Sequence, residues 1–306
     1  MIDLFYHRKR HNKGDKMKKP WNKDAEKEFF LKYMETETPE KLFYITDSDK
    51  YLAYWPKGYK GKKGTLQSRN SLIGKFTEKW VADLIQSTVK NKKLFAVQGA
   101  VCEELGLTKS SPADVVISVN NDKMQKAKDI LTIIEVKMSI VWNWELTKHK
   151  PDIILECVGN YKSHQGTPGL LRSDSMLKAI GKSANVRATL NSSNIPIIIV
   201  GNTPITSSYY DKVDHLKRIG FIQGFWSINP KPIDTAENIK STEEKGFYRF
   251  DKFNELKTCI CDLISKEMNF FSGMKSKKDL GMIIKVANEK TTYTEKAKEF
   301  LKLIGG

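Results

Sequence analysis

Two apolar stretches decide the fold of this chain: Ala113-Asp-Val-Val-Ile-Ser-Val119 and Leu131-Thr-Ile-Ile-Glu-Val-Lys-Met-Ser-Ile140. Both are rich in β-branched residues, which favour strands. The segment between them, residues 120–130, is short and polar, as expected for the turn of a hairpin. The sequence therefore predicts two neighbouring antiparallel strands, the second running on to about Trp142.

Three charged residues interrupt these strands: Asp114, Glu135 and Lys137. Glu135 and Lys137 are two apart on a strand, so their side chains project from the same face. A turn centred near Gln125 places Asp114 opposite Lys137 and diagonal to Glu135. Charges within apolar strands are costly unless they are paired or bound to a metal. Two adjacent carboxylates predict a cation between them, and oxygen ligands with open positions suit Mg²⁺.

The alternative is that Glu135 and Lys137 form a simple ion pair on an edge strand. The pattern Glu-x-Lys occurs three times, beginning at Glu135, Glu243 and Glu255. The second lies in a polar loop and the third in a helical stretch. Only Glu135 lies in a strand-like run that follows an acid at the start of a neighbouring strand, which favours a catalytic role.

The surrounding elements predict an α/β fold, with a mixed β-sheet flanked by helices and with helical and basic extensions. Apolar residues recur at helical spacing between Ser71 and about Thr88, with Asn70 or Ser71 available as the N-cap. Further expected elements are strands at Leu94–Val101, Ile195–Val200 and Phe221–Ile228, and helices at about Ser173–Leu190, within Phe250–Phe271 and at Thr294–Ile304.

These residues resemble the PD-(D/E)xK nuclease superfamily, and within it the type II restriction endonucleases. Glu135-Val136-Lys137 fits the second half of the motif, whereas Pro112-Ala113-Asp114 has one residue between proline and aspartate. The family core begins with a helix that often supplies another acid, and Glu78 matches that position. The resemblance implies a restriction-endonuclease-like core.

The resemblance also implies a function: Mg²⁺-dependent hydrolysis of double-stranded DNA at a specific short sequence, as in restriction–modification. Asp114, Glu135 and the backbone carbonyl of Val136 would hold the metal. Glu78 would assist, and Lys137 would orient the attacking water or stabilise developing charge. A duplex cut by one site per chain implies a homodimer, and without a Walker-type glycine loop no nucleotide cofactor is expected.

Three parts of the chain are expected. Residues 1–66 are expected to be a basic N-terminal extension and loop, with the first 27 residues as an arm. Residues 67–229 are expected to form the nuclease core. Residues 230–306 are expected to be a mostly helical C-terminal subdomain.

The chain is strongly basic, with 52 Lys and Arg against 36 Asp and Glu, a net charge of +16. Such an excess favours a polyanionic partner. No membrane segment, signal peptide or cysteine framework is evident, so a cytoplasmic protein is expected. The polar residues expected to contact DNA are Gln67, Arg69, Asn70, Lys162, His164, Gln165, Arg172 and Lys178.

Each of these eight residues could instead be solubilising surface, and His164 could be a rival catalytic base. Two other functions also stay open. One is a structure-selective nuclease of the same type, such as a junction resolvase or repair enzyme. The other is a basic DNA-binding protein without catalysis, in which the Glu135–Lys137 pair is structural.

Overall fold

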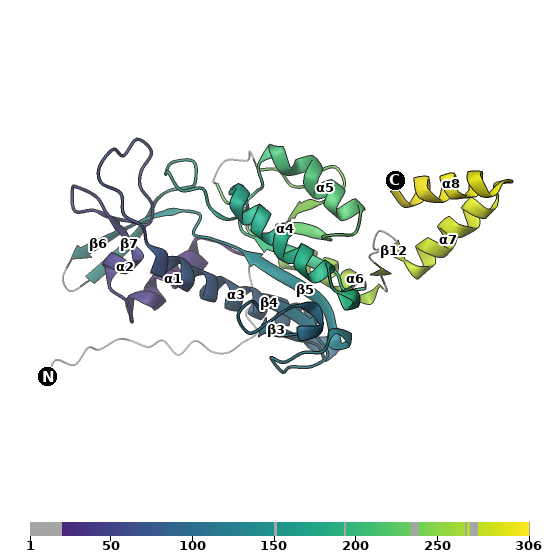
Figure 1. Ribbon diagram of the computed structural model, residues 1–306. Coiled ribbons are helices and arrows are strands. Elements are labelled where there is room, and N and C mark those ends of the chain that lie inside the picture. Colours follow the sequence, from purple (N-terminus) through teal and green to yellow (C-terminus); the bar gives the residue numbers. More distant parts are fainter. Residues whose placement is uncertain are drawn as a thin grey trace.

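The structure is a computed structural model that describes residues 20–149, 152–192, 194–233, 238–266, 268–269 and 275–305. Its centre is a sheet with helices packed around it (Figure 1). The sheet is mixed, with the strand order β10-β9-β8-β5-β4-β3. This confirms the expected α/β fold with a mixed sheet flanked by helices. The strands are β3 (Phe95–Ala100), β4 (Ala113–Ser118), β5 (Ile130–Lys137), β8 (Ile197–Gly201), β9 (Gly224–Ser227) and β10 (Phe247–Arg249).

The expected hairpin is formed by β4 and β5, but its register differs from the prediction. Val115 pairs with Ile134, so continuing the register brings Asp114 level with Glu135 instead of Lys137. The connecting segment contains a 3₁₀ turn at Ala127–Asp129, and the pairing is irregular between Ile117 and Ser118. The predicted register assumed a regular turn at the middle of the linker, so it could not take the 3₁₀ turn and the irregular pairing into account. The error is two residues, which leaves the side chains on the same face.

Helices cover both faces of the main sheet. On one face α3 (Gln67–Val89) packs on β3, β4 and β5 and is joined by α6 (Phe253–Ser265). The other face carries α4 (Ser173–Arg187) and α5 (Tyr210–Arg218). Alternate residues of β5 enter the two cores, Ile134 with α3 and Ile133 with α4. Glu135 therefore projects toward α4.

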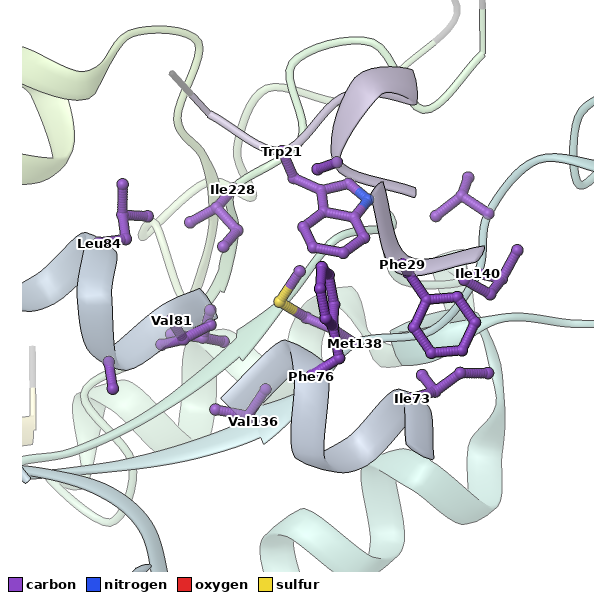
Figure 2. Close-up of a cluster of buried hydrophobic side chains, with 14 of the residues drawn as sticks. Trp21, Phe29, Ile73, Phe76, Val81, Leu84, Val136, Met138, Ile140 and Ile228 are labelled. Atoms are coloured by element: carbon purple, nitrogen blue, oxygen red, sulfur yellow. The ribbon is translucent and has the colours of Figure 1, made fainter. Parts of the chain in front are cut away.

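The N-terminal part of the chain is folded into the core, contrary to the expected extension of residues 1–66. Trp21 is fully buried and packs edge-on against Phe76 of α3 (Figure 2). The backbone N–H of Trp21 donates to the carbonyl of Ile228 (2.8 Å). The helices α1 (Lys23–Met34) and α2 (Pro39–Leu42) follow. The expected arm reaches residue 27, and its residues 1–19 lie outside the described residues.

A second, antiparallel sheet has the order β1-β2-β6-β7 and was not expected from the sequence. The run predicted as one strand up to Trp142 ends at Lys137, and a new strand begins at Asn143. The strands are β1 (Tyr44–Ile45), β2 (Tyr51–Leu52), β6 (Asn143–His149) and β7 (Asp152–Gly159).

The core also extends beyond the expected boundary at residue 229, because β10 completes the main sheet and α6 packs on α3. After them come β11 (Met268–Asn269), β12 (Lys275–Ser276), α7 (Lys277–Asn288) and α8 (Tyr293–Gly305). The two last helices lie at one end of the molecule (Figure 1). Among the described residues, none of the helices combines the length and apolar character needed to span a bilayer.

Candidate active site

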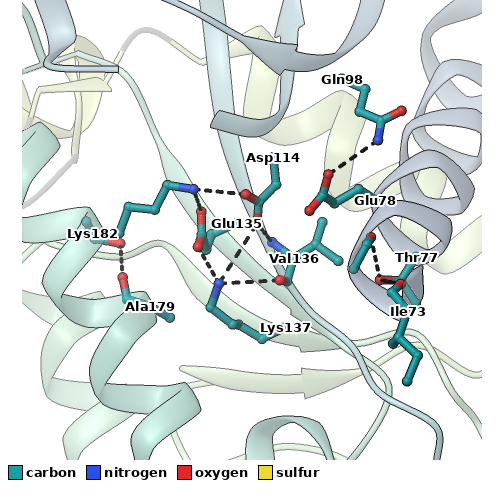
Figure 3. Close-up of polar contacts among 12 residues, drawn as sticks. Ile73, Thr77, Glu78, Gln98, Asp114, Glu135, Val136, Lys137, Ala179 and Lys182 are labelled. Atoms are coloured by element: carbon teal, nitrogen blue, oxygen red, sulfur yellow. Dashed lines mark hydrogen bonds and ion pairs between the residues drawn. The ribbon is translucent and has the colours of Figure 1, made fainter. Parts of the chain in front are cut away.

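Four charged side chains form a ring at the edge between β4, β5 and α4 (Figure 3). The Lys182 ammonium lies 2.9 Å from Asp114 Oδ1 and 2.6 Å from Glu135 Oε2, so it bridges the two carboxylates. Lys137 Nζ contacts Glu135 Oε1 and lies 3.9 Å from Asp114 Oδ2. The structure therefore brings together the three residues that the strand pattern predicted and adds a second lysine.

Backbone contacts hold the ends of these strands in place. The N–H of Val136 donates to Asp114 Oδ2 (2.7 Å), which ties the carboxylate on β4 to the backbone of β5. Just after β5, Asn202 accepts from the N–H of Ser139 (3.1 Å) and donates to its carbonyl (2.6 Å). Gly169 has a φ of +53°, and a Cβ there would come within 3.2 Å of the Lys137 carbonyl oxygen. The hydrogen bonds of Val136 and Asn202 therefore fix the strand end that carries Lys137, and Gly169 leaves room for its carbonyl.

Burial and charge set the electrostatics of the ring. Glu135 is only 4% exposed. Burial raises its pKa, the nearby Asp114 carboxylate raises it further, and Lys137 and Lys182 oppose the rise. Burial works against the charged form of Lys182, but Asp114 and Glu135 outweigh this effect and raise its pKa. The charge states of Glu135 and Lys182 therefore depend on the charges beside them.

Glu78 approaches the ring from α3, as the sequence predicted (Figure 3). Gln98 of β3 donates to Glu78 Oε2 through its amide (3.3 Å). Burial raises the pKa of Glu78, and the charge of Asp114 raises it further. Glu78 is therefore close enough to Asp114 for their charges to interact, and Gln98 of β3 orients its side chain.

The donor set of the ring suits a hard divalent cation. Two carboxylates already surround one positive charge, the Lys182 ammonium, and carboxylate oxygens are preferred ligands of Mg²⁺. The described residues contain no group of three or more His, Cys, Asp or Glu arranged to hold a metal ion as they stand. A cation at this position would thus rely on Asp114 and Glu135, with backbone or solvent oxygens completing the shell.

Two members of this site, Lys182 and Gln98, were missed in the sequence. Lys182 lies on a helix that follows the second sheet, and neither strand alternation nor hairpin register relates it to β5. The one available signal was its spacing from Lys178, since residues four apart share a helix face. Gln98 lies in a strand that was predicted, but nothing in its pattern distinguished it from other polar positions.

Arg69 corrects the expected set of DNA contacts. The prediction placed it before the helix, but α3 begins at Gln67, without the Asn70 or Ser71 cap, and Arg69 is only 2% exposed. Its guanidinium donates to the carbonyls of Leu42 (3.0 Å) and Ala53 (2.6 Å). Arg69 therefore joins α3 to the N-terminal segment and does not present its guanidinium to DNA.

Arg69→Met is expected to destabilise the fold by about 3 kcal/mol, because two buried carbonyls lose a charged donor. In the wild type, the Arg69 guanidinium also lies over the rings of Tyr44 (5.0 Å) and Tyr54 (5.3 Å). Methionine would replace these contacts only in part. Urea unfolding measures the loss, with the exposed Lys75→Met on the same helix as control. If Arg69→Met kept wild-type stability and lost DNA affinity, the residue would be a DNA contact after all.

His164 and Gln165 also have structural partners. His164 is 2% exposed, stacks on Tyr54 at 4.0 Å between ring centroids and lies 3.2 Å from the carbonyl of Val141 through Nε2. Burial lowers its pKa to about 4, so it is neutral near pH 7. This placement contradicts His164 both as a DNA contact and as a catalytic base. The exposed Gln165 side-chain amide donates to the carbonyls of Pro56 and Tyr59, so it holds the loop that contains these two residues.

The other five residues expected to contact DNA lie at or near the surface. Arg172 and Lys178 are exposed on or just before α4 and share Asp174 as their ion partner. The remaining three are exposed in the first turn of α3 and in the loop after β7, and they are Gln67, Asn70 and Lys162.

A comparison of the chain with protein-family models, curated proteins and solved structures finds no match.

Proposed function

We propose that the protein is a Mg²⁺-dependent endonuclease of the PD-(D/E)xK type that hydrolyses double-stranded DNA at a specific short sequence. The observation that carries the proposal is the ring itself. Asp114 and Glu135 are held around one positive charge at adjoining strand ends, with Lys137 beside them. The mixed sheet flanked by helices is a scaffold of the kind that this motif implies.

Each residue has a role that follows from its position. Asp114 and Glu135, with the carbonyl of Val136, would hold the metal. Mg²⁺ bound there would polarise the phosphodiester and lower the pKa of a bound water. Lys137 lies against Glu135 and 3.5 Å from the Val136 carbonyl, where its ammonium can orient water or stabilise charge on the phosphate. Glu78 adds negative charge at the rim of the same site.

Double-stranded DNA as the partner is supported by charge and by α4. The net charge of +16 favours a polyanion. Lys178 lies one helical turn before Lys182, so α4 places an exposed lysine on the same face as the lysine of the ring. Cutting both strands with one such site per chain would require two copies, and a homodimer is part of the proposal.

Digestion of a mapped plasmid with purified protein and Mg²⁺ tests the function. The expected result is a ladder of discrete fragments whose ends share one short sequence. If the protein cuts only branched or damaged DNA, it is a structure-selective nuclease and not a restriction endonuclease. DNA binding without any Mg²⁺-dependent cutting would instead indicate a non-catalytic binding protein and overturn the proposal.

A further inference from the structure

The Lys182 ammonium lies where a cation shared by the two carboxylates would lie. It is within 2.9 Å of Asp114 Oδ1 and 2.6 Å of Glu135 Oε2, whereas Lys137 Nζ contacts Glu135 and is farther from Asp114, at 3.9 Å. The bridging position therefore belongs to Lys182. Its side chain comes from α4, a different element from the strands that carry the two acids (Figure 3).

The ring is balanced in charge as it stands. Two ammonium groups face two carboxylates, and the side chains of Asp114 and Glu135 are only 14% and 5% exposed. Placing a divalent cation between the same oxygens would bring it against the Lys182 ammonium. Like charges at such short range in a partly buried site repel strongly. A metal and the Lys182 ammonium cannot share the bridging position.

We propose that Lys182 is a built-in counter-ion that stabilises the acidic pair in the metal-free protein and must leave it when a divalent cation binds. The inference rests on the proposed function, because it assumes that Asp114 and Glu135 are the metal ligands. Lys182 is able to move, since its side chain is 24% exposed and is long and flexible. Once displaced, its ammonium is available to a DNA phosphate, which would couple metal binding to DNA binding.

Lys182→Met tests this inference through two effects of opposite sign. Without metal, the variant is expected to melt at a lower temperature than the wild type, because the two carboxylates lose their shared cation. Its affinity for Mn²⁺, measured by isothermal titration calorimetry without DNA, is expected to rise about tenfold, because no ammonium has to be displaced. A residue with only a structural role would lower stability without tightening metal binding.

Lys240→Met is the matched control. Lys240 also bridges two carboxylates, Asp251 at 2.7 Å and Glu255 at 3.0 Å, but in a separate ion-pair group. Its loss should leave the Mn²⁺ affinity of the candidate site unchanged. The double variant Lys182→Met with Glu135→Ala should lose the Mn²⁺ binding that the single variant gains, which assigns the binding to this site.

The outcomes separate the inference from the proposed function. If the wild type binds Mn²⁺ through Glu135 and Lys182→Met binds it no more tightly, Lys182 is not a competing counter-ion, while the metal site stands. If Lys182→Met binds Mn²⁺ more weakly, Lys182 supports the metal site and the inference is likewise overturned. If neither protein binds Mn²⁺, the metal site fails and the inference fails with it.

Discussion

Asp114→Ala and Glu135→Ala are expected to lower Mg²⁺-dependent DNA cleavage by about 10³-fold or more and to remove Mn²⁺ binding. Lys137→Ala is expected to lower cleavage to a similar extent but to keep Mn²⁺ binding, because an ammonium is not a metal ligand. The three variants thus share a loss of cleavage and differ in metal affinity. Single-turnover cleavage and calorimetric Mn²⁺ titration, measured on the same protein samples, distinguish the two classes.

Glu243→Ala is the control for these variants, since Glu243 begins another Glu-x-Lys triplet but is exposed and lies outside the ring. It should cleave at the wild-type rate. Melting curves of all variants establish that loss of cleavage is not loss of fold. Full activity of Asp114→Ala, Glu135→Ala or Lys137→Ala would refute the role given to that residue.

Glu26→Ala is expected to have the largest effect on stability, about 4 kcal/mol or more. The Glu26 carboxyl is fully buried and accepts hydrogen bonds from four N–H groups. Replacing Glu26 with alanine leaves all four N–H groups without this acceptor. The donors are the indoles of Trp21 (3.2 Å) and Trp144 (3.0 Å) and the backbone amides of Val141 (2.6 Å) and Trp142 (3.2 Å).

These contacts tie α1 to the segment that follows Lys137, so the loss should also reach the candidate site. Urea unfolding measures the effect. Glu28→Ala, an exposed position on the same helix, should change stability by less than about 0.5 kcal/mol. Equal stability of the two variants would show that the buried carboxyl contributes nothing net to the fold.

The same residue gives the fold a dependence on pH. Burial raises the pKa of Glu26 to about 8 against the opposing effect of its N–H donors, from a usual value of 4.5. Between these two values the folded protein holds a proton that the unfolded chain has released. Stability therefore falls as pH rises through this range. The Glu26→Gln variant cannot titrate there, so its unfolding free energy should fall less with pH than that of the wild type. Parallel slopes would contradict the assignment.

Local pattern was sufficient to predict the central strands and helices of the main sheet. β-branched runs predicted β4, β5 and β8. An apolar stripe predicted α3, because a helix that buries one face has apolar residues at regular helical spacing. The two-residue spacing of Glu135 and Lys137 placed both on one face. Asp114 was predicted to lie beside Glu135 and does so, although the predicted cross-strand pairing was wrong by two residues.

What the sequence could not predict depends on contacts between distant segments. Lys182 enters the site because α4 packs against β5, and Gln98 enters it because β3 pairs with β4 and packs against α3. The spacing of residues within each element does not show which elements pack together. Arg69 looked like a polar residue available to DNA. Whether an arginine reads a base or holds two carbonyls is decided by tertiary burial. The prediction of an arm over the first 27 residues followed from their many Lys, Arg and His residues, whereas Trp21, which anchors this segment, is buried in the core.

The most direct test of the account compares the wild type with Glu135→Gln, purified in the same way, on one mapped plasmid with Mg²⁺. The variant keeps the size of the side chain and removes its charge, so a contaminating nuclease would cut equally in both samples. We expect discrete fragments from the wild type and none from the variant, with DNA affinity retained in Ca²⁺. Equal cutting by both proteins, or no cutting by either, would contradict the claim that the ring of Asp114, Glu135, Lys137 and Lys182 is a nuclease active site.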